Sequence, residues 1–120
     1  AGFRTFAMVS LGACGFSIIA VRAYELFSSS GFNIAMMAGQ VVGGAGFLAA
    51  GLIVLHKEQV HGLTTGAGLW VAAAIGLACG FGLYALALFI ALLSVLIFGL
   101  FWHVEQRLVG PQQAHDIQDR

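Results

Sequence analysis

The sequence predicts an all-α membrane protein, a polytopic bundle of four transmembrane helices. Of its 120 residues, 60% are hydrophobic and only 8% are charged, whereas soluble domains carry about a quarter charged residues. A soluble fold of this size could not bury so much apolar surface. Seventeen glycines and a single proline suit closely packed helices better than a loop-rich domain.

The first two helices follow from apolar runs that end at polar breaks. The first run predicts a helix over about residues 6–26, with Arg22 and Glu25 one turn apart near its end. The second helix is predicted over residues 34–55, a stretch of 22 residues without a charge, after a polar break at residues 28–31. A span of the bilayer takes about 20 residues, so both runs are long enough.

The third and fourth helices come from one apolar run over residues 63–102. A single helix of that length would measure about 60 Å, twice the thickness of the hydrocarbon core. The run must therefore turn back, and the best break is Gly80-Phe81-Gly82. This division predicts helices over residues 64–79 and 83–102, with Thr64 as the N-cap of the first.

The chain thus divides into a transmembrane domain, residues 1–104, and a polar tail, residues 105–120. With four crossings, four of the five positive charges fall on one side of the membrane, and only Arg22 lies toward the other. This bias predicts that the first side, which holds the C-terminus, is cytoplasmic. The four charges are Arg4, Lys57, Arg107 and Arg120.

Small residues recur in GxxxG-like stripes on the two middle helices. Such stripes let helix backbones approach closely, and we expect these two helices to form the packed centre. The predicted helix-packing residues are Gly39, Gly43 and Gly46 on the second helix, and Gly68, Ala72 and Gly76 on the third. The fourth helix is rich in Leu, Phe and Ile all round, so it faces lipid or another helix, and Ala87, Ala91 and Ser94 form its one small patch.

Few polar side chains lie within the spans. Gln40 is the most polar of them, and it either hydrogen-bonds a neighbouring helix or faces a ligand pathway. His56, His61 and His103 lie near the cytoplasmic end and are expected to be solvated, because no paired spacing favours a metal site. A hydroxyl-bound ion near Thr64 is a weaker interpretation than helix capping.

No motif argues for an enzyme. The sequence has no nucleophile elbow, Walker loop, zinc-protease motif or paired carboxylates. We therefore expect no catalytic residues, no cofactor and no metal. Formal net charge is zero without a basic patch, so nucleic acid is not an expected partner. The expected partners are the lipid bilayer and other membrane-protein subunits or further copies of the chain.

Three stretches together resemble the membrane domain of the MgtC/SapB family over about residues 1–100. Residues 1–5 read Ala-Gly-Phe-Arg-Thr, and residues 40–51 begin with Gln and continue through a Gly-rich run. Residues 61–65 read His-Gly-Leu-Thr-Thr, followed by Trp70 and by Ala-Ala-Ile-Gly-Leu at 73–77. The spacing between these stretches also agrees with the family.

The resemblance implies a bacterial inner-membrane protein linked to magnesium homeostasis and, in some members, to control of complexes such as ATP synthase. It singles out six candidate polar or ligand-facing residues: Arg4, Thr5, Gln40, His61, Thr64 and Thr65. Asn33, Met36 and His61 stand where the family usually has charged residues. The family's usual first helix and its C-terminal regulatory domain are also not recognised, so a further N-terminal helix is expected to be missing from this stretch.

The predicted function is a non-enzymatic accessory subunit or regulator of a larger membrane complex or of magnesium homeostasis. The alternative is a transporter of an ion or small solute. A hydrated polar pathway at mid-membrane would distinguish them, and the sequence offers only Gln40 and a few hydroxyls for one.

Overall fold

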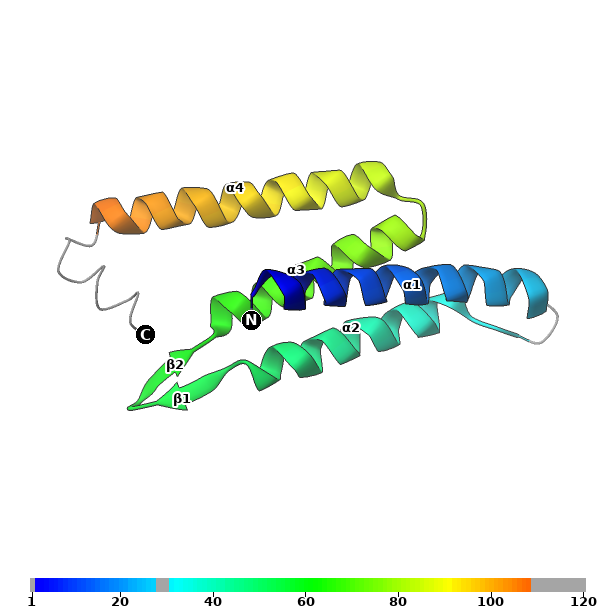
Figure 1. The fold of residues 1–120 in the computed structure, drawn as a ribbon, viewed down its shortest axis with the longest axis horizontal. Helices are drawn as coiled ribbons and strands as arrows, with labels where there is room; N and C mark the ends of the chain where they lie inside the picture. Colours follow the sequence, from blue (N-terminus) through cyan, green and yellow to red (C-terminus); the bar gives the residue numbers. More distant parts are fainter. Residues whose placement is uncertain (1, 28–30, 109–120) are drawn as a thin grey trace.

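The structure is a computed structural model that describes residues 2–27 and 31–108, and four helices dominate it (Figure 1). All four are long and apolar enough to cross a membrane, which confirms the predicted all-α transmembrane fold. A two-stranded hairpin, which was not predicted, joins the second and third helices. The elements are α1 (Phe3–Phe27), α2 (Ile34–Gly51), β1 (Val54–His56), β2 (Gln59–His61), α3 (Leu63–Gly80) and α4 (Tyr84–Leu108).

The helix ends differ from the predicted ones where a helix continues beyond the apolar residues of its span. α4 continues to Leu108, into the predicted tail, because a helix can extend past the bilayer into water while hydropathy marks only the apolar span. The predicted break at residues 28–30 and the rest of the tail, from residue 109 on, lie outside the described residues.

The prediction of helix through residue 55 is wrong, because α2 ends at Gly51 and residues 54–61 form the β1–β2 hairpin. Leu55 pairs with Val60 in the antiparallel register, and the two-residue turn is Lys57-Glu58. Both turn residues adopt positive φ, 47° and 64°, as a type I′ hairpin turn requires. A short apolar run does not distinguish a strand from the end of a helix, which is why the sequence missed it.

The predicted N-cap Thr64 is also wrong, because α3 is preceded by Gly62 at φ 85°. A Cβ at Gly62 would collide with the carbonyl oxygen of Leu52, so only glycine allows this return of the chain. The other turn falls at the predicted break: α3 ends at Gly80, and Gly82 adopts φ 79°.

α3 is the central helix, and its closest neighbour is α1, to which it runs parallel (Figure 1). A Cβ built on Gly76 would lie 2.9 Å from the Cβ of Ala13 and closer still to the carbonyl oxygen of Ser10. At Gly80 it would lie 2.5 Å from the Cys14 carbonyl oxygen. The prediction that the second and third helices form the packed centre is therefore wrong in its choice of the second.

Further contacts of α3 complete the bundle. A Cβ built on Gly66 would lie 3.1 Å from the carbonyl oxygen of Ala49, so α2 packs against the start of α3. Ala13, Ala45 and Ala73 are buried together, one from each of α1, α2 and α3. These alanines mark the point where the three helices meet.

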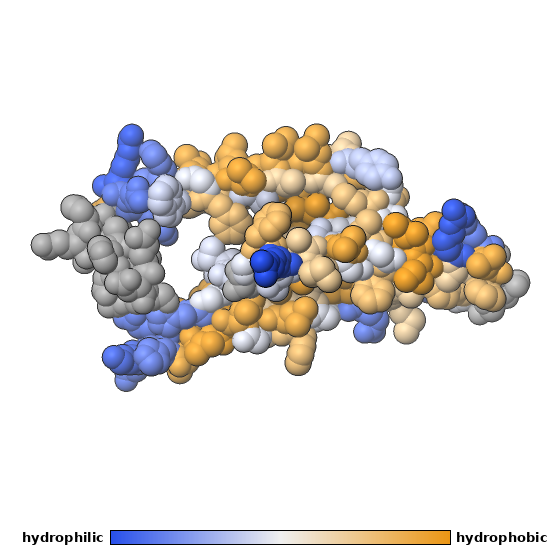
Figure 2. Space-filling view, viewed as in Figure 1, coloured by the Kyte–Doolittle hydropathy of each residue, from blue (hydrophilic) through white to orange (hydrophobic). Residues whose placement is uncertain are grey.

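The charges of α1 give the depth of each residue in the bilayer. Eighteen positions, or about 27 Å of helix, separate Arg4 from Arg22, close to the roughly 30 Å thickness of the hydrocarbon core. Ala13 is halfway between them, so the three buried alanines lie near the midplane. Figure 2 shows apolar residues along much of the helices and hydrophilic residues at the hairpin, at the end of α4, at the end of α1 and in the middle of this face, where α1 begins.

Candidate functional site

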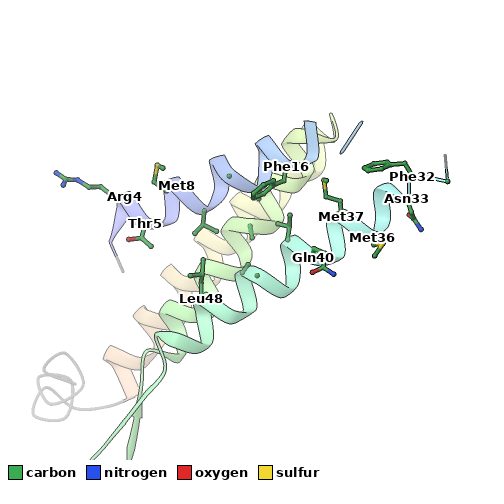
Figure 3. Close-up of a pocket in the computed structure, with 18 residues that line it drawn as sticks. Arg4, Thr5, Met8, Phe16, Phe32, Asn33, Met36, Met37, Gln40 and Leu48 are labelled. Atoms are coloured by element: carbon green, nitrogen blue, oxygen red, sulfur yellow. The ribbon is translucent and has the colours of Figure 1, made fainter. Parts of the chain in front are cut away.

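An open groove of about 1160 Å³ lies between α1 and α2, and Ala73 of α3 also lines it (Figure 3). Its walls are mostly apolar, and three methionines, Met8, Met36 and Met37, contribute to them. Four polar side chains also line it: Arg4, Thr5, Asn33 and Gln40. Three of the six candidate residues from the sequence therefore share one groove, namely Arg4, Thr5 and Gln40.

The polar side chains are separated along the groove. Arg4 and Thr5 belong to the first turn of α1, and Figure 3 shows Arg4 extending away from the helix at that end. Gln40 lies toward the other end, five residues from buried Ala45 and hence about 7 Å beyond the midplane. Roughly 20 Å of apolar wall separates Thr5 from Gln40. The groove thus has no continuous polar path among the residues that the structure describes.

The side chain of Gln40 is exposed, and it makes no hydrogen bond to any other residue within 2–27 and 31–108. Its expected role in joining helices is therefore not filled by a helix of the described chain. A partner helix or a ligand in the groove would have to supply the hydrogen bond.

Thr64 and Thr65 lie elsewhere, in a second cavity of about 390 Å³ formed by α3, α4 and Phe6 of α1. Ser94 of α4 also lines this cavity, and its hydroxyl donates to the Ala91 carbonyl oxygen at 2.8 Å. The three hydroxyl-bearing side chains bring no charge with them. The six candidate residues therefore do not form one site.

His61, the remaining candidate, lies on β2, where it faces His56 across the hairpin. Their ring centroids are 6.4 Å apart at an interplanar angle of 60°. The register places both side chains on one face of the hairpin, a pairing that the sequence reasoning missed. The signal would have been two histidines on either side of a tight turn, His56 directly before it and His61 two positions after Gln59, which places both on one face of a hairpin. Among the described residues no group of three His, Cys, Asp or Glu side chains could hold a metal ion.

The two glycine stripes behave differently. On α3, a Cβ at Gly68 would lie 3.1 Å from the Phe6 ring, and Gly76 packs against α1. On α2, by contrast, no atom of the described chain lies within 4 Å of a Cβ built on Gly39, Gly43 or Gly46. The α2 stripe therefore does not pack against another described helix, and its predicted role in packing stays a prediction for a contact outside these residues.

The small patch of α4 is used inside the chain. Ala87 is buried, and Ser94 lines the cavity shared with α3. The small residues of this patch allow α4 to approach α3. The outer surface of α4 is left with large apolar side chains, among them Leu88, Phe89 and Leu92.

Comparison with known proteins gives consistent matches. A sequence model described as the MgtC family matches residues 1–107. The "Putative magnesium transporter YhiD" of Escherichia coli K12 is 34% identical over 113 residues, which cover 92% of this chain and 53% of that protein. The "Protein MgtC" of Brucella abortus strain 2308 is 40% identical over 83 residues, 69% of this chain and 33% of that protein. The chain spans about half the length of the first relative and less of the second. No solved structure shows a significant match.

Proposed function

Because the chain belongs to the MgtC family of membrane proteins, we propose that it acts in magnesium homeostasis as a non-enzymatic accessory subunit or regulator of a larger complex of the bacterial inner membrane. In this proposal the C-terminal end of α4 and the β1–β2 hairpin face the cytoplasm. The orientation is supported by the order of the elements, which puts Arg4 at the start of α1, Lys57 after two crossings and Arg107 at the end of the fourth, on the same side of a membrane.

The observation that carries the proposal is the unpacked glycine stripe of α2. Small residues on membrane helices let two backbones come close enough for van der Waals contact. The corresponding stripe of α3 is used in this way, since Gly76 and Gly80 contact α1. Gly39, Gly43 and Gly46 form an equally suitable surface that no described residue covers. We infer that a helix of another subunit, or of a second copy, covers it.

The proposal of a non-enzymatic role draws on the lining of the two cavities described above. The two cavities contain one charged side chain between them, Arg4, and no nucleophile placed beside a base. A binding or regulatory protein needs shape and contact area rather than reactive groups. This supports action through contacts between helices.

The test compares two glycine-to-leucine variants in native membranes solubilised in mild detergent. Gly43→Leu should leave the chain folded, because a Cβ at this position meets nothing within 4 Å, but it should remove the chain from the larger complex in co-sedimentation. Gly76→Leu should impair the fold itself. Leu93→Ala, on the half-exposed surface of α4, is the control for a general effect of mutation.

Two results would contradict this role. The wild type would sediment alone, or the Gly43→Leu variant would remain fully in the complex. A complex made only of identical chains would support the α2 stripe as a contact surface but would contradict the accessory-subunit role.

The second candidate function is a transporter, which is supported by the polar residues at both ends of the α1–α2 groove. The roughly 20 Å apolar stretch between them disfavours it, because a hydrated ion needs polar partners along its path. Calorimetry with Mg²⁺ provides a direct comparison, since magnesium is usually held by carboxylates and waters. Stoichiometric binding at micromolar affinity would move the transporter ahead; the accessory role predicts none.

A further inference from the structure

We propose that the α1–α2 groove binds an anionic phospholipid of the bilayer, with the headgroup phosphate at Arg4 and one acyl chain along the groove toward the midplane. The site is distinct from the α2 glycine stripe, because Gly44 lines the groove while Gly43 does not. It is therefore independent of the proposed accessory role.

Charge complementarity favours an anionic headgroup. Arg4 is the only charged side chain that lines the groove, and no carboxylate within residues 2–27 and 31–108 pairs with it. The one ion pair found there joins Arg22 to Glu25 at the opposite end of α1. The Thr5 hydroxyl beside Arg4 can donate a further hydrogen bond to a phosphate oxygen. A zwitterionic headgroup would also bring a cationic amine, whose repulsion by the guanidinium offsets part of the attraction to the phosphate.

The part of the groove between Arg4 and Ala13 has the length of one leaflet. From Arg4 to Ala13, at the midplane, is nine positions of α1, or about 14 Å, which is close to half the thickness of the hydrocarbon core. A phosphate at Arg4 would thus lie at its normal depth. Its acyl chain would pass Met8 and Gly12 and reach Ala13 and Ala73 at the meeting point of the helices.

The walls favour a flexible chain. Methionine side chains adapt to irregular apolar partners, and Met8 lines the part of the groove between Arg4 and Ala13. Gly12 and Gly44 widen it, since no atom lies within 4 Å of a Cβ built on either. These features suit an acyl chain that changes conformation.

The test is native mass spectrometry of the purified 120-residue chain with an equal mixture of phosphatidylglycerol and phosphatidylethanolamine. The wild type should retain phosphatidylglycerol preferentially. Arg4→Gln should lower this preference about fivefold, the ratio expected for one cation at an anionic membrane surface. Arg107→Gln is the matched control, because Arg107 is also exposed and lies at the end of α4, away from the groove.

A second pair of variants tests the groove itself. Gly44→Leu should fill it and lower the amount of bound lipid, whereas Gly43→Leu, one position away and outside the groove, should not. Circular dichroism checks that both variants keep their helices. Neither new Cβ meets another atom of the described residues, so both are expected to fold.

Four results would overturn the proposal. Retention of the two lipids in equal amounts would mean unselective surface lipid only. An equal effect of Arg4→Gln and Arg107→Gln would mean general charge attraction. Unchanged lipid binding in Gly44→Leu would exclude the groove. Loss of a bound protein chain in Gly44→Leu, with lipid selectivity unchanged, would assign the groove to a partner helix.

Discussion

The contact between α1 and α3 at Gly76 makes the sharpest prediction about the fold. Gly76→Ala adds one methyl group where a Cβ would lie 2.9 Å from the Cβ of Ala13 and from the carbonyl carbon of Ser10. It would lie closer still to the Ser10 carbonyl oxygen. Two of these atoms are backbone atoms, so no side-chain rotation relieves the contact and α1 must move away from α3 along part of its length.

The expected loss of stability in Gly76→Ala follows from that displacement of α1. Overpacking a tight interface typically costs about 1–3 kcal/mol, and contact with backbone places this variant at the upper end, near 3 kcal/mol. Helix propensity works in the other direction, since alanine in place of glycine inside a helix gains up to about 1 kcal/mol. We therefore expect a net loss of about 2 kcal/mol in the free energy of unfolding.

The assay is unfolding of the detergent-solubilised chain with increasing sodium dodecyl sulfate, followed by reaction of a thiol-specific dye. Cys14 and Cys79 are free and half-buried, and Cys14 belongs to this interface, so the dye reports its opening. Gly15→Ala on α1 is the matched control, because its Cβ would meet nothing within 4 Å. The control should be as stable as the wild type or slightly more stable. Equal stability of Gly76→Ala and Gly15→Ala would refute the close approach of the two helices.

Three further predictions concern the ends of the elements. The bias of four of the five positive charges predicts that the hairpin faces the cytoplasm. A cysteine at Glu58, in a chain whose native cysteines are replaced, should then resist an impermeant reagent applied to intact cells, and ready labelling would reverse the orientation. Replacing Lys57-Glu58 by Asn-Gly should raise the stability of the hairpin by up to about 1 kcal/mol, because both positions have positive φ. The gain would be measured as slower amide exchange of Val60, and unchanged exchange would contradict the turn geometry. Asn33→Ala should lower the free energy of unfolding by about 1 kcal/mol in the same detergent titration, because the Asn33 side chain accepts a hydrogen bond from the Ala35 N–H at 2.9 Å. An unchanged free energy of unfolding would mean that this cap contributes nothing.

Hydropathy and length were enough to predict the four spans and the turn at residues 80–82. The apolar run over residues 63–102 is too long for one crossing, and Gly80 and Gly82 lie where the chain must reverse. The hairpin could not be predicted in this way. Val54 and Leu55 continue the apolar run of α2, and hydropathy alone cannot tell that their backbone becomes extended.

The pairing of helices was harder to predict than their existence. The glycines of α2 and α3 look alike in sequence, yet only those of α3 meet another described helix. The pairing of α1 with α3 depends on how α1 is rotated about its own axis, because this rotation turns the Ser10 and Cys14 carbonyl oxygens toward α3. Such a rotation depends on all the helices together, and no spacing rule within one helix gives it.

The candidate site was predicted in part. Arg4 and Thr5 lie far from Gln40 in the sequence, and the resemblance to the family identified them without indicating that they line one groove. Thr64 and Thr65, identified in the same way, line a different cavity. Motif positions identify residues, whereas the antiparallel arrangement of α1 and α2 determines which of them share a surface.

The parallel arrangement of α1 and α3 has a consequence for how the protein is made. Ser10 and Gly76 are 66 positions apart, and the whole of α2 and the hairpin must leave the ribosome before they meet. During that interval the small-residue face of α1 has no helix against it, so lipid or the insertion machinery must cover it. The bundle closes only when α3 enters the membrane. A nascent chain that stops at Gly62 would therefore present an incomplete helix pair to the proteases that remove unassembled membrane proteins.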